Sequence, residues 1–560
     1  MMSNSHDFKI VETHKSRRNR FHMCPDHKTT MNVGDLVPLA CIEMLPDDSF
    51  VGKAAHLDRV ISSFIKAPID NLYMDVNFFF VPTRLIWKNW VNMFGQNDDG
   101  YWVLKKEYKV PQVSVRFGGG SIPSAYVSQS IPDYLGLGYT NKDIPEDKTI
   151  SQLPFRAFAK VWNDWYRNEN TQAPVMIEYP EDQTFYVNGA SWGPTNIFGM
   201  PPKVSKMHDY FTSALPAPQK GNTPNLLDLM SGGLAPVYAS STVRNQLPSS
   251  PSGIHYVTGS GASIADGTRP VFAAGTIAAG PSGADSIQTQ AVPDNLLADI
   301  NGVIPELTVN DIRYAFAIQR ILESDARYGT RYTEFIQGQF GVINPDARLQ
   351  RSEYIDGFRT PITFQEVPQT SQGTNDSPQA NISAFSKTLG QGRFIKSATE
   401  YGFFLAVGCI RQKHTYSQGI ERMWRKKTRF DFFHPALANI GEQPIYSSEL
   451  YATANDDLIF GYQESWAEHR FLPDRVSGYM RPAVPANLAV WNFADFYANT
   501  PVYNQSFLDE TEAYVNRTLS VPSPASPQFL VDFVLDIQAT RPLPLVGIPR
   551  LVDHIGETGY

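Results

Sequence analysis

The stretch Leu72-Tyr-Met-Asp-Val-Asn-Phe-Phe-Phe80 carries the clearest strand signal in the N-terminal half of the chain. Its apolar side chains recur at every second position, which places them on one face of an extended strand. These residues are Leu72, Met74, Val76, Phe78 and Phe80. The intervening Tyr73, Asp75 and Asn77 fall on the opposite face. A strand with one apolar face predicts a sheet that covers a hydrophobic core.

Further strand and helix signals lie on both sides of this stretch. The predicted strands are one within 29–50 that ends at a proline-bounded turn, the continuous apolar run 403–410, and the alternating segment 529–537. The predicted helices are 85–94, 153–169 and one that begins at Thr308 and stops at Gly329. Strands spread from residue 30 to residue 540 therefore predict a mainly β protein, in which one sandwich core carries long insertions.

Composition and charge fit a protein that contacts copies of itself. The 560 residues are 42% hydrophobic, 12% aromatic and 19% charged, and they include 41 prolines. Low charge with many aromatic residues suits a chain that buries much of its surface in β-rich contacts. The net charge of −8 is unlike that of a protein that coats a nucleic acid by itself. A separate basic protein is therefore expected to neutralise any packaged genome.

The sequence predicts no membrane insertion, catalytic residue, metal site or cofactor. The three cysteines, Cys24, Cys41 and Cys409, form no Cys-x-x-Cys pair, and the first twenty residues are polar and basic. The apolar run 403–410 is too short to cross a bilayer. His-Glu-x-x-His, Gly-x-Ser-x-Gly and P-loop patterns do not occur. These features favour a soluble protein that is made in a reducing cytoplasm.

Residues 221–300 differ in composition from the rest of the chain. They are rich in Gly, Ser, Ala and Pro, they contain no tryptophan, and no lysine occurs from 221 to 386. A stretch with so few large side chains is a poor source of core residues. We therefore expect an ordered insertion displayed on the surface at 221–300, between core regions at 29–220 and 301–560. A disordered linker is the alternative.

Two basic clusters are candidate contacts for single-stranded nucleic acid, because each mixes cations with aromatic residues. The first lies in a predicted N-terminal arm, 1–28, and the second follows residue 421. The candidate DNA-contacting residues are Lys15, Arg17, Arg18, Arg20, Arg425, Lys426, Lys427 and Arg429. A solvated or inter-subunit charged face is the alternative, and it is at least as plausible for the second cluster.

The segment 311–354 is dense in Arg, Tyr and carboxylates without a recognisable catalytic pair. Planar arginines beside tyrosines are typical of interfaces. The candidate inter-subunit or loop-anchoring residues are Arg327, Arg331, Tyr332, Glu334 and Arg348. Since this segment directly follows the lysine-free insertion, we expect it to lead the chain back into the sandwich.

Several phrases, in order along the chain, resemble the major capsid proteins of the Microviridae, in the gokushovirus branch. They include Glu43-Met-Leu-Pro46, Phe78-Phe-Phe-Val-Pro-Thr-Arg-Leu-Ile-Trp87, Trp165-Tyr-Arg-Asn-Glu-Asn170, Asp209-Tyr-Phe-Thr-Ser-Ala-Leu-Pro216, the segment 311–354, Gly419-Ile-Glu-Arg-Met-Trp424, Phe460-Gly-Tyr-Gln-Glu464 and Pro544-Leu-Val-Gly-Ile-Pro549. The resemblance covers most of the chain except 221–300 and the region around 100–150.

The resemblance implies an eight-stranded antiparallel jelly roll with long inter-strand insertions and a few short helices. It implies a structural role, in which copies assemble through pentamers into a T=1 icosahedral shell around circular single-stranded DNA. Residues 221–300 would then project at the threefold axes, where they could contact a bacterial surface receptor. The other implied partners are a small basic DNA-condensing virion protein and a DNA pilot protein. The protein would be part of the virion, assembled in the cytoplasm of the bacterial host.

Two other functions are compatible with parts of the sequence. A β-sandwich carbohydrate-active enzyme would use the abundant Trp and Tyr together with two opposed carboxylates. The absence of a signal-peptide pattern and the shared phrases count against it. A dedicated single-strand-binding protein conflicts with the net charge of −8. Electron microscopy or sedimentation separates these functions, because a capsid protein forms uniform particles and an enzyme remains a small species.

Overall fold

The computed structural model describes residues 18–95, 108–115, 128–137, 148–178, 191–221, 309–329, 331–370, 381–452 and 458–546, with residues 373 and 379 and six short strands between 237 and 298. The chain divides into two compact units. The first unit comprises Met1–Pro218 and Tyr328–Tyr560, and the second comprises Gln219–Arg327. Most of the predicted insertion 221–300 lies outside the described residues.

Two antiparallel sheets form the centre of the first unit. The six-stranded sheet contains β1 (Asn19–Met23), β2 (Asp26–Met31), β4 (Ser49–Val60), β15 (Phe364–Pro368), β16 (Ile382–Ser397) and β22 (Phe529–Arg541). Its order is β1-β22-β4-β16-β15, and β2 also pairs with β22. The four-stranded sheet contains β3 (Val37–Met44), β5 (Leu72–Pro82), β14 (Glu353–Ile362) and β17 (Gly402–Gln412), in the order β14-β5-β17-β3. The strands predicted at 72–80, 403–410 and 529–537 are therefore confirmed.

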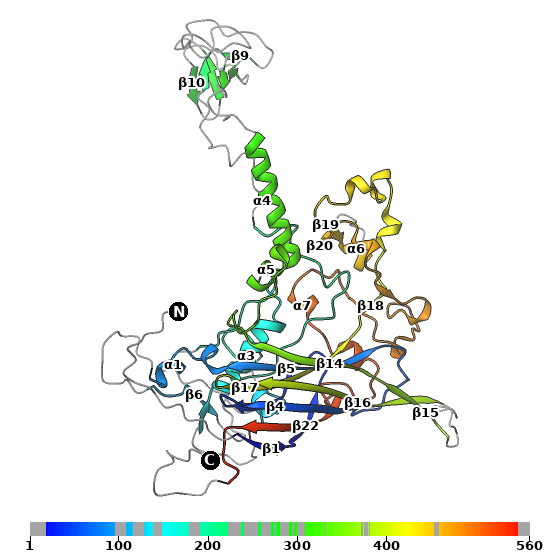
Figure 1. Cartoon of the computed structure of the whole chain (residues 1–560). Helices are drawn as coiled ribbons and strands as arrows, with labels where there is room; N and C mark the ends of the chain where they lie inside the picture. Colours follow the sequence, from blue (N-terminus) through cyan, green and yellow to red (C-terminus); the bar gives the residue numbers. More distant parts are fainter. Residues whose placement is uncertain are drawn as a thin grey trace, which may run out of the picture. The chain divides into compact units, whose positions relative to one another are not determined.

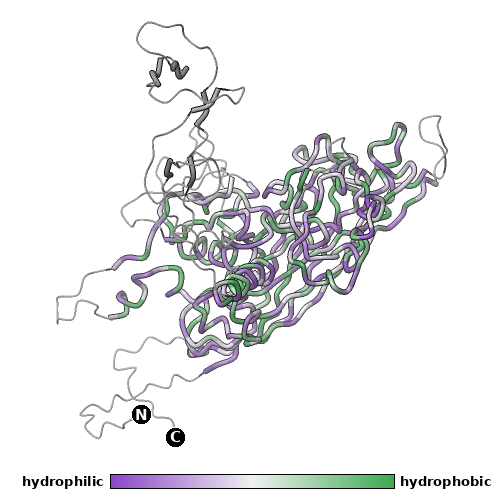
Figure 2. Tube along the Cα trace, turned by 90° about the horizontal axis from the view of Figure 1, so that it is seen from above, coloured by the Kyte–Doolittle hydropathy of each residue, from purple (hydrophilic) through white to green (hydrophobic). Residues whose placement is uncertain are grey.

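The two sheets lie in stacked layers (Figure 1) and share one hydrophobic core. At its centre the Phe394 ring lies 4.8 Å from that of Phe78 and 4.7 Å from that of Phe404, measured between centroids. Hydrophobic and hydrophilic segments alternate along the trace of this unit (Figure 2). Along β16, buried and exposed residues alternate over most of the strand, as a period of two predicts.

A glycine on β4 makes room for the central ring of this core. The Phe394 ring lies so close to Gly52 that a Cβ at this position would overlap it. Replacing Gly52 with Ala is therefore expected to lower the free energy of unfolding by about 1–3 kcal/mol, as overpacking does. Thermal or denaturant unfolding measures the effect. Gly193→Ala is the control, because no atom lies within 4 Å of the added Cβ there. Equal stability of the two variants would contradict the packing argument.

The second face of the four-stranded sheet is buried as well, which the sequence did not predict. Helix α3 (Leu153–Val161) and a π-helical turn, η2 (Trp162–Tyr166), pack over Phe79, Val81 and Leu405. Asp75, expected on a polar face, is buried and accepts hydrogen bonds from Arg359 (2.5 Å) and Arg411 (3.0 Å). Because two guanidinium groups surround it, this carboxylate remains satisfied away from water.

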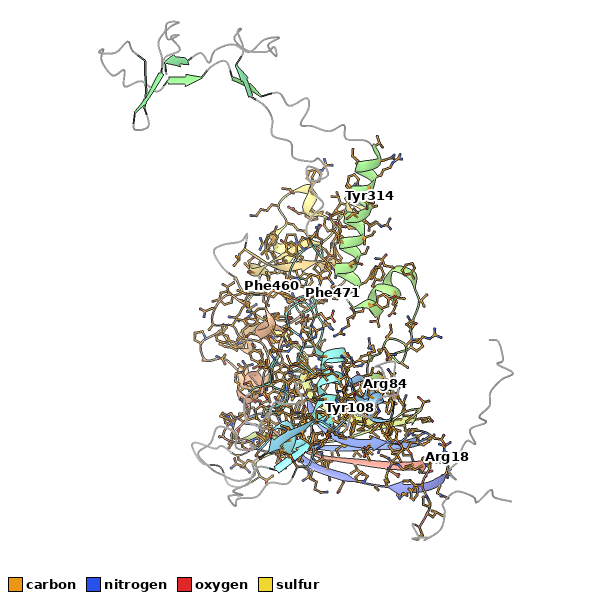
Figure 3. All side chains as sticks on the ribbon, turned by 90° about the vertical axis from the view of Figure 1, so that its left-hand side faces the viewer. Arg18, Arg84, Tyr108, Tyr314, Phe460 and Phe471 are labelled. Atoms are coloured by element: carbon orange, nitrogen blue, oxygen red, sulfur yellow. The ribbon has the colours of Figure 1, made fainter. Side chains whose placement is uncertain are left out.

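The remaining described elements of the first unit are short. The strands are β6 (Gln112–Val115) with β7 (Lys148–Ser151), β18 (Thr415–Tyr416) with β21 (Asp474–Arg475), and β19 (Gln443–Tyr446) with β20 (Ile459–Gln463). The helices are η1 (Thr83–Leu85), α1 (Trp90–Met93), α2 (Ile131–Tyr134), α5 (Tyr332–Phe340), η3 (Arg422–Arg425), η4 (Arg429–Asp431), η5 (Pro435–Leu437), α6 (Ser447–Leu450), η6 (Ala467–His469), η7 (Gly478–Met480), η8 (Ala489–Trp491), α7 (Gln505–Leu508) and α8 (Ala513–Asn516). Loops around β19 and β20 enclose a separate hydrophobic cluster, to which Phe460 and Phe471, labelled in Figure 3, belong.

The helix predictions agree with the structure to different degrees. The predicted helix 153–169 ends at Tyr166, because the chain becomes extended at Arg167. The helix predicted at 85–94 is replaced by two short pieces, η1 and α1. The helix predicted after Thr308 is α4 (Val309–Tyr328), and it stops at Gly329, whose φ of +107° favours glycine. The Thr308 cap itself lies outside the described residues.

The described part of the second unit consists of three two-stranded pairs and nearly all of α4. The pairs are β8 (Val237–Ala239) with β13 (Leu296–Ala298), β9 (Tyr256–Thr258) with β12 (Ala291–Pro293), and β10 (Pro270–Ala273) with β11 (Thr276–Ala279). All three pairs are antiparallel. The recurrent Val and Ile residues of this stretch favour strands.

Candidate functional site

Arg331 joins the start of α5 to the segment that follows α3. Its backbone N–H donates to Oε2 of Glu334 (3.1 Å), and its guanidinium donates to Oε1 of Glu169 (2.9 Å) and to the carbonyl oxygen of Arg167 (3.0 Å). The Arg167 guanidinium donates to the same oxygen of Glu169 (3.0 Å). One carboxylate thus holds two arginines, in charge-assisted contacts that tie together segments 162 residues apart.

The return from α5 into β14 is held by a second set of contacts. Ser352 donates to Oδ2 of Asp164 through its backbone N–H and its hydroxyl, both at 2.8 Å. The Trp165 indole donates to the Ser352 carbonyl oxygen (3.0 Å). The Arg351 guanidinium stacks 3.7 Å from the Trp165 ring and pairs with Asp346 at 3.1 Å. Sequence reasoning missed these residues, although Trp165 opens one of the quoted phrases.

Two of the five predicted anchoring residues contact each other within the first unit. Arg331 and Glu334 meet at the start of α5. Tyr332 is 69% exposed, and Arg348 is exposed as well. Arg327 lies on α4, in the second unit. Tyr332 and Arg348 are therefore accessible to solvent, and their role as inter-subunit contacts stays a prediction.

A cavity of about 510 Å³ opens beside the Arg331 contacts. Its wall includes Glu169, Arg331 and Glu334 together with Lys206, His208 and Arg411. Burial, followed by the charge of Arg411, lowers the pKa of His208, so this imidazole is neutral at pH 7. The cavity wall thus combines carboxylates with cations.

A buried ionic cluster lies close to this cavity, around His414. The His414 ring nitrogens lie 2.7 Å from Oδ1 of Asp495 and 3.2 Å from the carboxylate of Glu510. Lys206 lies 3.3 Å from Asp495, to which the Tyr497 hydroxyl also donates (2.7 Å). Burial alone would lower the pKa of His414, but the two carboxylates raise it to about 10. Burial likewise opposes ionisation of Asp495, yet His414 and Lys206 lower its pKa to about 2. His414 and Asp495 are therefore both ionised at neutral pH.

The second basic cluster lies on and between the short helices η3 and η4, and half of its candidate residues are engaged within the chain. Arg425 stacks 4.2 Å from the Tyr446 ring, and Lys426 lies 3.7 Å from Glu468. Lys427 and Arg429 are exposed, and Arg429 lies 5.0 Å from the Phe430 ring. The fold therefore leaves Lys427 and Arg429 as the accessible cations of this cluster.

The first basic cluster is described only in part, since Lys15 and Arg17 lie outside the described residues. Arg18 (Figure 3) donates to the Ser49 hydroxyl (2.7 Å) and lies 3.4 Å from Asp47. Arg20 is exposed on β1, opposite Thr540. The strands β1 and β2, at residues 19–23 and 26–31, both pair with β22. Most of their residues fall within the predicted N-terminal arm, 1–28. The sequence of residues 19–31 gives no sign of this pairing, because β22 lies about 500 residues later in the chain.

Two further searches concern metals and membranes. Within the described ranges, no three His, Cys, Asp or Glu side chains are grouped so that they could hold a metal ion. In the same part of the chain, no helix has the length and apolarity needed to cross a membrane.

Comparisons with known proteins agree over nearly the whole chain. Residues 9–551 match the family described as capsid protein (F protein). Capsid protein VP1 of Spiroplasma virus 4 is 36% identical over 566 residues, which cover 98% of this chain and 97% of the relative. Capsid protein VP1 of Bdellovibrio phage phiMH2K is 33% identical, with 98% of each chain covered. Capsid protein VP1 of Chlamydia phage 1 is 31% identical, with 97% of each chain covered.

Proposed function

This chain belongs to the F capsid protein family of the Microviridae, close to its gokushovirus members, and from that premise we propose that its copies assemble through pentamers into a T=1 icosahedral shell enclosing circular single-stranded DNA. As a capsid protein it is a structural component of the virion that associates with copies of itself, and it is not an enzyme. The carbohydrate-active enzyme considered above is thereby excluded.

We propose that the two sheets form the eight-stranded jelly roll of this family. Four strands of the larger sheet follow the order β2-β22-β4-β16, and the smaller sheet follows β3-β17-β5-β14. In chain order these eight strands alternate between the two sheets, except that β5 and β14 follow each other in the smaller sheet. This is the order that two interlocked Greek keys produce. β1 and β15 extend the larger sheet at its two edges.

The observation that carries self-assembly is the exposed aromatic surface between β18 and β19. The exposed large apolar side chains of this segment are Met423, Trp424, Phe430, Phe432, Phe433 and Ile440. Trp424 and Phe430 are 74% and 65% exposed. Soluble monomers rarely expose so many large rings in one short segment, whereas interfaces between subunits are enriched in Trp, Phe, Met and Arg. We name residues 422–440 the aromatic segment.

The remaining partners follow from the family and from charge. A net charge of −8 supports a separate small basic protein that condenses the DNA, and we propose a DNA pilot protein beside it. We further propose that 221–300 projects from the shell at the threefold axes and contacts a bacterial surface receptor. Assembly would take place in the cytoplasm of the host.

Sedimentation and electron microscopy of the purified full-length protein test the proposed assembly. We expect a concentration-dependent conversion of small species into particles of one size, because closed symmetry repeats the same contacts. A protein that stays monomeric over a wide range of concentration and salt would contradict it. Particles with several sizes or open tubes would contradict the T=1 geometry but leave self-association intact.

A further inference from the structure

The exposed face of the six-stranded sheet carries two pairs of directly opposed cations. In the register of β4 and β16, Lys53 lies opposite Arg393, and Arg59 lies opposite Lys387. All four side chains are exposed. We call these two pairs the cation rungs. Opposed residues of an antiparallel pair have their Cβ atoms about 5 Å apart, and like charges in such positions are destabilising.

Within the described residues, no carboxylate forms an ion pair with the cation rungs, although Asp536 of β22 lies opposite Lys53 in the register of β4 and β22. None of the four cations forms an ion pair or a side-chain hydrogen bond there. The remaining outward positions of β4 and β16 carry no acidic residue; they are Ser49, Val51, Ala55, Leu57, Ser383, Phe385, Leu389, Gln391, Ile395 and Ser397. On β22, Asp536 pairs with His22 at 2.7 Å, and Asp532, which lies opposite Leu57, pairs with Lys28 at 3.7 Å. Arg59 lies opposite the apolar Leu530, so the rung of Arg59 and Lys387 has no carboxylate directly opposite it on β22.

Apolar side chains lie between and beside the cation rungs. Leu57 lies opposite Leu389 between the two rungs, and Val51 lies opposite Ile395 beyond one of them. Leu389 and Ile395 are 62% and 70% exposed, and the partly exposed ring of Phe385 lies beyond the other rung. The two rungs are six residues apart along β4, which corresponds to about 20 Å. Figure 1 shows β4 and β16 side by side in the outer layer of the sandwich.

We propose that this sheet face binds single-stranded nucleic acid, with phosphates on the cation rungs and bases against the apolar side chains between them. Unstacked bases present apolar faces, whereas a duplex presents only its charged backbone to a flat surface. The opposed cations, which repel each other in the free chain, would then be neutralised by the ligand. The inference rests on the proposed function, in which the single-stranded genome is the enclosed polyanion. None of the four cations is among the predicted DNA-contacting residues.

Binding of a fluorescein-labelled oligothymidine to the full-length protein, followed by anisotropy over a range of salt concentrations, tests the inference. For each double variant, Lys53→Gln with Arg393→Gln and Arg59→Gln with Lys387→Gln, we expect the slope of log K against log salt to flatten by about 1.4, since each phosphate contact contributes about 0.7. The control, Lys88→Gln with Lys109→Gln, removes the same charge at exposed positions outside the sheet and should keep the wild-type slope.

Two companion measurements make the outcomes distinct. Thermal unfolding of the double variants should match or exceed that of the wild type, because the substitutions relieve repulsion. Slopes equal to that of the control would overturn the inference. Variants with a wild-type slope but without particles in sedimentation would also overturn it, since the face would then be a contact between subunits. Wild-type protein that binds the oligonucleotide but forms no particles would instead count against the proposed shell alone.

Discussion

Replacing Trp424 and Phe430 with Ser is expected to leave a folded protein that no longer forms particles at the concentration that suffices for the wild type. Both side chains are mostly exposed, so their loss removes little from the core. Buried aromatic anchors at interfaces contribute about 2 kcal/mol or more each. Loss of about 4 kcal/mol from one subunit contact weakens it roughly a thousandfold. Because every subunit carries the same substitutions, the effect recurs at each copy of the contact.

Sedimentation velocity over a concentration series measures this effect, and thermal unfolding checks the fold. The matched control is Trp424→Phe with Phe430→Leu, which keeps large apolar groups at both positions and should retain assembly. Particle formation by the serine variant at wild-type concentration would show that the aromatic segment is not an assembly contact. A large drop in unfolding temperature would mean that these side chains support the fold instead.

The strands could be predicted from the sequence, but their neighbours could not. Period-two alternation at 72–80 and 529–537 depends only on which side chains face the core. Nothing in that pattern says that β22 lies between β1 and β4. The prediction for the second face of β5 was wrong, because the polar Asp75 indicated a face exposed to solvent. That face is covered by α3, and Asp75 accepts hydrogen bonds from Arg359 and Arg411. These arginines lie on β14 and β17, which neighbour β5 in the sheet but are 284 and 336 residues away in sequence.

The candidate sites show the same division between local and distant information. The density of Arg and Tyr at 311–354 pointed to Arg331 and Glu334, whose contact spans three residues. Glu169, the carboxylate that holds Arg331, lies 162 residues earlier, so no local pattern identifies it. The cation rungs are a stronger example. Lys53 and Arg393 are isolated cations in the sequence, and only the register of β4 and β16 makes them a pair.

The largest loss of stability from one substitution is expected at His414. Replacing it with Gln removes the positive charge between Asp495 and Glu510, while both carboxylates stay buried. Breaking a buried ion pair typically costs about 3–5 kcal/mol, because a charge is left uncompensated. Here Glu510 loses the cation that faces it, whereas Asp495 keeps Lys206 at 3.3 Å. Denaturant unfolding measures the loss. His22→Gln is the control, since His22 also lies 2.7 Å from an aspartate but is mostly exposed, and its loss should change stability little.

The same cluster predicts how stability depends on pH. The pKa of His414 is about 10 in the folded chain, compared with an ordinary value of 6.5, so its contribution is complete below pH 6.5 and declines as the pH rises towards 10. The pKa of Asp495 is about 2, compared with 3.8, so its contribution is complete above pH 3.8 and declines as the pH falls towards 2. Unfolding measured from pH 6.5 to 10 should therefore show a loss of stability in the wild type that is much reduced in His414→Gln. Parallel pH profiles of the two proteins would mean that His414 is neutral in the folded state and that the cluster is held by Lys206 alone.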